Sequence, residues 1–230
     1  MKALYFNLRK TLMGVNGPMQ FSVMATLAKK ERCGIFGPSG AGKTSLLRML
    51  AGLTEPEQGC IIHDTDIWFD AKQFKNRRTQ NRNLGYVFQD FALFPHLTVQ
   101  KNMEFAMRHK NEKDRIDFLL EKTALTGFRK RYPHQLSGGQ KQRLAFARAL
   151  VSPPSLLLLD EPFAAVDWEG RKHMRELLAD ENLKIDCPIL LVSHDPRDML
   201  ALVSRVLILN EGKLIADGKP QAILPNCEMV

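Results

Sequence analysis

The sequence predicts an α/β fold: a parallel sheet, an antiparallel β part before it, and a helical segment inserted into it. Three observations support this prediction. Strand-like and helix-like segments alternate along most of the 230 residues. Residues 155–160 form an apolar run that ends in Asp160, which is typical of a parallel strand buried on both faces. A glycine-rich segment, residues 37–44, joins a short apolar stretch to a helical pattern.

The residue pattern of the N-terminal third predicts strands with one helix between them. Residues 3–8 and 20–25 are expected to be strands, and the second alternates around Phe21, Val23 and Ala25. Residues 32–36 predict the buried strand before the glycine-rich segment, and a helix then runs to a C-terminal signal at Gly52. Residues 59–68 predict a small hairpin, and residues 84–88 predict a further strand.

The middle of the chain is mostly helical, and the alternation then resumes. Helical patterns cover residues 98–107, 112–125 and a segment that ends at Leu150, before two prolines. Residues 168–183 and 196–203 predict helices, while 189–193, 206–209 and 214–216 predict strands. We therefore expect one domain over residues 1–230, with a core subdomain of residues 1–89 and 152–230 and a helical subdomain of residues 90–151.

Composition is typical of a soluble globular protein, with 44% hydrophobic and 25% charged residues. No apolar run approaches the roughly 18 residues of a membrane span. The N-terminus also lacks the apolar core of a signal peptide. The four cysteines show no C-x-x-C pattern, so we expect reduced thiols in a cytosolic protein.

Lysine and arginine total 33 against 25 acidic residues, a formal net charge of +8. Such an excess favours contact with nucleic acid or an anionic membrane surface. The densest basic cluster has no row of interleaved aromatic residues that could stack on bases, so we interpret it as a solvated loop and expect no nucleic-acid partner. This cluster consists of Lys72, Lys75, Arg77, Arg78 and Arg82.

The glycine-rich segment fits the phosphate-binding P-loop pattern of two glycines followed by Lys and a hydroxyl residue. The glycines let backbone N–H groups point inward at phosphate oxygens. Lys43 would place its charge at the β- and γ-phosphates, and the Thr44 hydroxyl would ligate Mg²⁺. The expected phosphate-binding set is Gly37, Pro38, Ser39, Gly40, Ala41, Gly42, Lys43, Thr44 and Ser45.

Two carboxylates follow the buried strand of residues 155–160. Asp160 would hold Mg²⁺ through water, and Glu161 would orient and deprotonate an attacking water. The P-loop alone leaves kinases, GTPases and many ATPases open, and this pair narrows the choice toward hydrolysis.

With these motifs in place, the chain resembles the ATP-binding subunits of ABC transporters. The resemblance rests on residues 37–44, Gln89, the pentapeptide at positions 136–140 (Leu-Ser-Gly-Gly-Gln), residues 156–161 with Asp167, and His194, in the order of that family. It spans nearly the whole chain, and the pentapeptide is its most discriminating motif.

The resemblance implies an ATP- and Mg²⁺-dependent ATPase whose site is shared by two chains arranged head to tail. Gln89 would touch the Mg²⁺ or the water, His194 would bond the γ-phosphate and help position Glu161, and Asp167 would lie near the partner's P-loop. The residues that would reach ATP on the other chain are those of the pentapeptide, Ser137, Gly138, Gly139 and Gln140.

One expected feature is missing, because residues 10–17 hold no aromatic residue to stack on adenine. Four side chains remain open as substitutes, and the sequence does not choose between them. They are Met13, Tyr5, Phe6 and Phe21.

Residues 88–99, with Asn102, look like the importer subunits that serve molybdate, sulfate, ferric iron, maltose and polyamines. This resemblance implies a peripheral subunit at the cytoplasmic face of the membrane. The apolar loop of residues 91–96 would form a groove for a short coupling helix of a separate permease. We expect a homodimer, an indirect link to a solute-binding protein, and no C-terminal regulatory barrel. The N-terminal hairpin looks most like molybdate- or tungstate-type subunits. The alternatives are another solute or a non-transport ABC ATPase.

Overall fold

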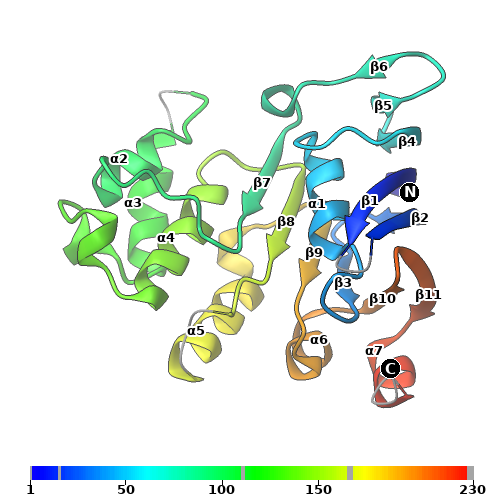
Figure 1. The fold of residues 1–230 in the computed structure, drawn as a ribbon. Helices are drawn as coiled ribbons and strands as arrows, with labels where there is room; N and C mark the ends of the chain where they lie inside the picture. Colours follow the sequence, from blue (N-terminus) through cyan, green and yellow to red (C-terminus); the bar gives the residue numbers. More distant parts are fainter. Residues whose placement is uncertain (1, 15–16, 110–111, 165–167, 227–230) are drawn as a thin grey trace.

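The computed structural model describes residues 2–14, 17–109, 112–164 and 168–226 of the chain (Figure 1). Its strands form one eleven-stranded sheet in the order β6-β5-β4-β1-β2-β11-β10-β3-β9-β8-β7. The strands are β1 (Lys2–Gly14), β2 (Gly17–Ala28), β3 (Arg32–Phe36), β4 (Gln58–His63), β5 (Asp66–Asp70), β6 (Lys75–Asn76), β7 (Leu84–Val87), β8 (Leu156–Asp160), β9 (Ile189–Val192), β10 (Arg205–Asn210) and β11 (Lys213–Gly218).

Five neighbouring strands make the parallel part of this sheet. Strands β10, β3, β9, β8 and β7 pair in parallel, with Gly34 opposite Leu191 and Leu158 opposite Leu190. Because these strands run in parallel, the glycine-rich loop after β3 and the acidic end of β8 lie at the same carboxyl edge of the sheet. The predicted fold class is confirmed. Ligands bind at this edge in α/β folds, so the fold places the predicted site residues where a ligand would bind.

The antiparallel strands belong to the same sheet. Strands β1 and β2 pair over nearly their whole length, and β11 links them to the parallel part through Lys213 opposite Ser22. Both strands are longer than the predicted 3–8 and 20–25, because the ladder continues to the Gly14–Gly17 pair.

The helices cover both faces of the sheet. Leu156 and Leu158 of β8 pack in the cluster that includes α1, whereas Leu157 and Leu159 face the cluster that includes α4 and α5. Burial on both faces explains why this strand is uniformly apolar. The helices are α1 (Lys43–Ala51), α2 (Val99–Glu104), α3 (Lys113–Lys122), α4 (Gly138–Ala149), α5 (Trp168–Ala179), α6 (Pro196–Leu202) and α7 (Pro220–Ile223).

Helices α2, α3 and α4 lie together beside β7 (Figure 1), and their buried side chains join the cluster on that face of the sheet. Three predicted helices are too long. Helices α2 and α3 end at Glu104 and Lys122, and α5 ends at Ala179 because the Asp180 carboxylate caps a separate short turn by accepting a hydrogen bond from the N–H of Asn182. Among the described residues, no helix is both long and apolar enough to span a bilayer.

Candidate functional site

The glycine-rich loop fits tightly between β3 and α1. Gly37 has a φ of 144°, and a Cβ there would lie 2.0 Å from the carbonyl oxygen of Leu209. Gly42 has a φ of 94°, and a Cβ there would lie 2.8 Å from the Phe21 ring. Both positions therefore need glycine, because a side chain would collide with the next strand or with a buried ring.

Lys43 begins α1 and reaches back over the loop. Its Nζ donates hydrogen bonds of 2.8 Å to the carbonyl oxygens of Gly37 and of Pro38. Burial lowers the pKa of Lys43, while the carboxylates of Glu161 and Asp160 oppose that shift. The ammonium group is thus held at the concave side of the loop, where a phosphate would need a positive charge.

Asp160, the last residue of β8, is 2% exposed and accepts two hydrogen bonds. The Thr44 hydroxyl donates to Oδ1 at 3.0 Å and the Tyr86 hydroxyl donates to Oδ2 at 3.2 Å. Burial raises the pKa of Asp160, and the hydroxyl hydrogen bonds oppose that effect. A buried carboxylate beside a hydroxyl is the oxygen donor set that Mg²⁺ prefers, so Thr44 and Asp160 fit this ion.

Glu161 and His194 form the second pair at this edge. His194 Nδ1 lies 2.8 Å from Glu161 Oε2, with Glu161 13% and His194 66% exposed at the side chain. Glu161 has a left-handed backbone, with a φ of 49°. This backbone conformation is rare for residues other than Gly and Asn, and such residues cluster at functional sites.

Gln89 shares a cavity with these groups. The cavity has a volume of about 440 Å³ and is lined by Lys43, Gln89, Glu161 and His194, together with the first residues of the loop. The structure therefore brings together predicted residues of the loop and of the segments after β7, β8 and β9. They surround one space large enough for a small ligand.

An ion-pair network supports the His194 segment from α5. The Arg171 guanidinium pairs with Asp195 at 2.5 Å, and its other nitrogen donates to the carbonyl oxygen of Phe163 at 3.3 Å. Arg171 thus joins the residue after His194 to the segment just after Glu161. The sequence interpretation missed Arg171, because only the tertiary fold places it beside both segments.

A second network fixes the backbone before His194. The Ser193 hydroxyl donates to Asp198 at 2.9 Å and accepts from the Asp195 N–H at 3.1 Å. Asp198 is fully buried and pairs with Arg175 of α5. The His194 segment is therefore held by charged and neutral hydrogen bonds on both sides.

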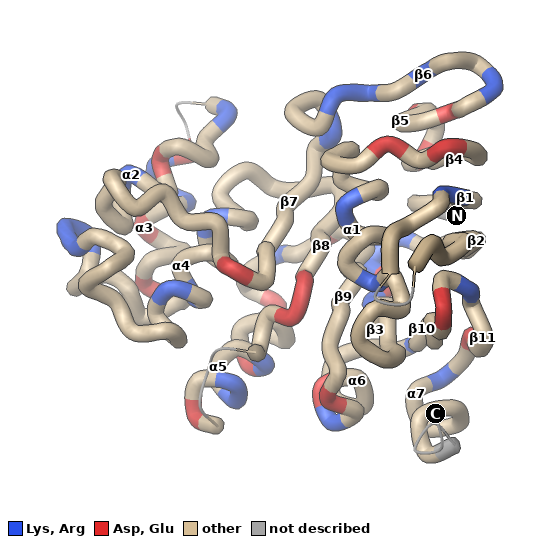
Figure 2. The backbone as a smooth tube through the Cα atoms, in the orientation of Figure 1, with Lys and Arg blue, Asp and Glu red and all other residues tan. Residues whose placement is uncertain are grey.

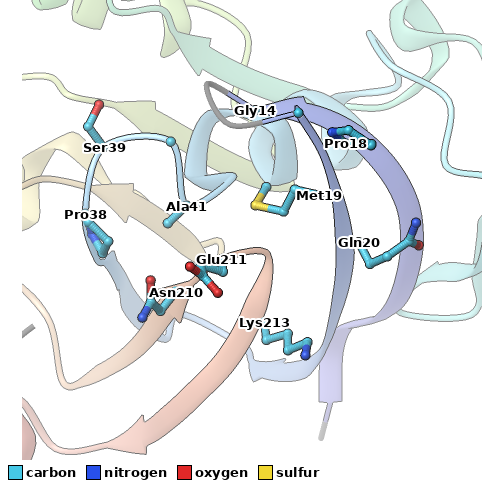
Figure 3. Close-up of a pocket in the computed structure, with 12 residues that line it drawn as sticks. Gly14, Pro18, Met19, Gln20, Pro38, Ser39, Ala41, Asn210, Glu211 and Lys213 are labelled. Atoms are coloured by element: carbon cyan, nitrogen blue, oxygen red, sulfur yellow. The ribbon is translucent and has the colours of Figure 1, made fainter.

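A second cavity of about 500 Å³ opens on the other side of the loop (Figure 3). The loop, the end of the β1–β2 hairpin and the β10–β11 turn enclose it. Figure 3 shows the Met19 sulfur directed into this space and Gln20 pointing away from it. Its lining includes Gly40, Ala41, Met19, Asn210, Glu211 and Lys213.

This cavity bears on the residue that would cover a nucleotide base. Phe6 and Phe21 are buried, and the Tyr5 hydroxyl lies against the Met24 sulfur. Met13 is 82% exposed and is not among the residues lining the cavity. None of the four sequence candidates therefore faces this space, and Met19 does. The signal was available, because Met19 lies two residues before Phe21 on the same face of β2.

Ser137 lies elsewhere, at the N-cap of α4. Its hydroxyl accepts from the Gln140 N–H at 3.3 Å, and the Gln140 side chain accepts from the Ser137 N–H at 2.9 Å. Ser137 and Gly138 are exposed, and none of residues 137–140 lines either described cavity beside the loop. Asp167, the remaining predicted site residue, lies outside the described residues.

The chain is similar to known proteins over most of its length. A family model described as ABC transporter matches residues 21–164. A probable sulfate/thiosulfate import ATP-binding protein of Chlorella vulgaris is 42% identical over 195 residues, which cover 83% of this chain and 80% of the relative. A molybdenum import ATP-binding protein of Vibrio vulnificus is 38% identical over 95% of this chain, which spans 58% of that relative's length.

A solved structure agrees with these relatives. It is a dimeric, post-hydrolysis ATP-binding cassette bound to ADP and Pi, which superposes with a TM-score of 0.77 at 29% identity over 94% of this chain and 98% of that one. The family match covers more than half of the chain and includes the glycine-rich loop, the pentapeptide and the acidic strand. The chain belongs to the ABC transporter family, as one of its ATPase cassettes.

Proposed function

We propose that this chain is the ATP-hydrolysing subunit of an ABC importer, which binds ATP at a head-to-tail dimer interface and drives a separate membrane permease. One observation carries the proposal: the Glu161–His194 pair lies beside Lys43 in one cavity, while Ser137 is exposed on another element. A single chain thus presents the hydrolytic groups without the pentapeptide that would close on the phosphate.

Each group then has a role that its position permits. Lys43 and the loop N–H groups bind the β- and γ-phosphates. Mg²⁺, held by Thr44 and Asp160 with Gln89 nearby, would neutralise charge on those phosphates. Glu161 would take the proton of the attacking water. His194 Nδ1 lies 2.8 Å from that carboxylate, and its exposed ring would bond the γ-phosphate.

The base of the nucleotide would occupy the cavity on the other side of the loop. Met19 offers a polarizable, apolar surface there in place of an aromatic ring. Because thioether contacts with a ring are modest, we expect weaker base selectivity than stacking on Tyr or Trp would give.

The partner chain completes the site. Ser137, Gly138 and Gly139 stand at the start of the twelve-residue helix α4, where the Ser137 hydroxyl and the N–H groups of the two glycines would face a phosphate on another copy. We assign Asp167 to the same interface. The dimeric cassette bound to ADP and Pi supports this assembly by similarity.

The permease would dock in an apolar groove between the core (residues 1–89 and 152–230) and the helical subdomain (residues 90–151). Phe94 packs against Phe105 at 4.4 Å between ring centroids, and the Arg148 guanidinium lies 5.5 Å from the Phe94 centroid. These side chains line a cavity of about 440 Å³ with Phe88 and Ala92. Such a groove suits a short coupling helix, which would place the chain at the cytoplasmic face of the membrane.

The names of the relatives bear on the solute. They import sulfate, thiosulfate or molybdenum, so we propose an oxyanion, molybdate or tungstate among them, delivered by a solute-binding protein. Import of another solute such as ferric iron or a polyamine, or a non-transport ABC ATPase, is the alternative. Copurification of the detergent-solubilised complex separates an importer subunit from a non-transport ATPase, because a permease and a binding protein would copurify with an importer subunit.

Mixing two inactive variants tests the shared site. Glu161→Gln and Ser137→Ala should each hydrolyse ATP poorly alone. In a mixed dimer, the Ser137→Ala chain supplies Glu161 and the Glu161→Gln chain supplies Ser137, so one site is intact and activity returns. If both residues served the same chain, the mixture would stay as inactive as its components, and the head-to-tail proposal would be wrong.

A further inference from the structure

The hairpin of β5 and β6 carries the most exposed large apolar side chain among the described residues. Phe74 lies in the turn between Asp70 and Lys75 and is 96% exposed. The hairpin stands at the edge of the sheet, at the top right of Figure 1. A lone ring this exposed has no role in the core, and nothing in the nucleotide site uses it.

The turn holds this ring outward. The Asp70 carboxylate accepts hydrogen bonds from the N–H groups of Lys72 and Gln73, at 2.9 and 3.2 Å, and from the Gln73 amide at 2.9 Å. Phe74 itself has a left-handed backbone with a φ of 53°, which is costly for an aromatic residue. The turn is thus fixed by its own hydrogen bonds while it presents Phe74 to solvent.

Basic residues flank Phe74 in the sequence of the hairpin, and the acids of β5 are already paired. Asp66 pairs with Arg77 at 2.7 Å, and Asp70 is bonded within the turn. In the described part of the chain, the exposed Lys72, Lys75 and Arg78 have no ion-pair partner. Figure 2 shows the resulting run of basic residues around β6.

The base of the hairpin is anchored firmly. Arg82 is 1% exposed and donates to the carbonyl oxygens of Met49 and Leu50, at 3.0 and 2.7 Å, at the end of α1. The same guanidinium donates to Asn76 of β6 at 3.0 Å and lies over the Trp68 ring of β5. Burial lowers the pKa of Arg82 to about 10, so it stays charged at neutral pH and keeps these bonds.

The hairpin also lies next to the apolar groove. Arg82 leads directly into Asn83 and Leu84, which line that groove, and the Arg108 guanidinium donates to the Arg82 carbonyl oxygen at 3.4 Å. If the groove receives a permease, as proposed above, the base of the hairpin is joined to that site, and the turn with Phe74 lies at the other end of the hairpin.

From these observations, we propose that the hairpin tip, Lys72, Phe74, Lys75 and Arg78, contacts an anionic lipid bilayer. Lysine and arginine beside a membrane attract acidic headgroups, and an aromatic ring partitions into the interface. The contact supplements docking in the groove and needs no ATP. Only the orientation of the chain on the bilayer rests on the proposed function; the lipid contact itself does not.

Vesicle binding by the purified chain, without a permease, tests this contact. Sedimentation would compare vesicles of phosphatidylcholine with vesicles that also contain phosphatidylglycerol, at low and high salt. Phe74→Asn removes the ring and suits the left-handed backbone, so the turn should stay intact. Phe74→Trp keeps an interfacial ring, and Lys29→Gln removes an exposed lysine from another turn.

We expect binding to the anionic vesicles only, weakened by salt. Phe74→Asn should reduce it about tenfold, and each of Lys72→Gln, Lys75→Gln and Arg78→Gln about fivefold. Phe74→Trp and Lys29→Gln should bind like the unaltered chain. Equal binding to neutral vesicles, or full binding by Phe74→Asn, would overturn the proposal. So would binding that appears only with permease-containing vesicles. The mixed-dimer test of ATP hydrolysis contains no lipid, so its outcome is independent of the vesicle result.

Discussion

The glycine-rich loop and the pentapeptide, the two ends of the proposed site, differ in how far they are linked to other elements of the chain. At the loop end, Lys43, Thr44, Asp160, Glu161 and His194 lie at the edge of one sheet and are linked through hydrogen bonds or a shared cavity. At the pentapeptide end, the side chain of the exposed Ser137 bonds within its own capping box.

This difference indicates where rigidity and exposure are needed. The loop end must hold charged groups in place before a ligand arrives, and burial and ion pairs achieve that. The pentapeptide end keeps its helix capped while its donors face outward. A site assembled from these two ends depends on meeting a second surface, so four substitutions can separate their contributions.

The largest effect should come from the loop end, with Glu161→Gln. Loss of the carboxylate that accepts a proton should reduce ATP hydrolysis about a hundredfold to ten-thousandfold. ATP binding should persist, because Lys43 and the loop are untouched, and closed dimers should accumulate. Phosphate release and size-exclusion chromatography with ATP measure both. Undiminished hydrolysis would remove Glu161 from its role.

Ser137→Ala should affect the other end in a different way. Hydrolysis should fall about a hundredfold, while a dilute chain binds ATP as before. The substitution also removes a helix cap, worth about 1 kcal/mol. Thr98→Ala is the matched control, because the Thr98 hydroxyl caps α2 in the same manner at 3.3 Å. Similar losses in both variants would mean that capping, and no contact with ATP, explains the effect.

Arg171→Met should produce an intermediate effect. Without the link between Asp195 and Phe163, Glu161 and His194 lose their common support, and kcat should fall about tenfold or more with little change in KM for ATP. Arg197→Met is the control, because that arginine also bonds Asp195 but is 78% exposed and does not reach Phe163. Equal effects of the two variants would argue against a positioning role for Arg171.

The smallest effect concerns stability and its pH dependence. The pKa of Asp195 is below its ordinary value, mainly because the Arg197 side chain hydrogen-bonds to it, with Arg171 contributing. A carboxylate with a lowered pKa stabilises the fold above about pH 4 and loses that contribution as the pH falls further.

Asp195→Asn should therefore lower the free energy of unfolding by about 2 kcal/mol at neutral pH. The gap between variant and unaltered chain should narrow below about pH 4. Urea denaturation at pH 7 and pH 3 measures this. A gap that stays constant with pH would show that Asp195 contributes through packing and not through its charge.

Sequence reasoning located the groups whose chemistry lies in local motifs. Lys43 and His194 follow recognisable strands and Asp160 ends one, so the α/β pattern placed them at one edge of the sheet. Tyr86 and Arg171 were missed, because their partners are distant in sequence and only the packing of β7 against β8, and of α5 beneath β9 and α6, reveals them. The length of α5 was wrong because the Asp180 side chain caps a separate short turn directly after it, and α2 ends three residues before the predicted end at residue 107.

The loop and β10 are in close contact at Gly37, because even a Cβ there would lie 2.0 Å from the Leu209 carbonyl oxygen. A displacement of the β10–β11 turn should therefore also displace the loop. The Glu211–Gly212 turn is thus a poor position for a fluorescent label, since the attached dye would itself disturb nucleotide binding.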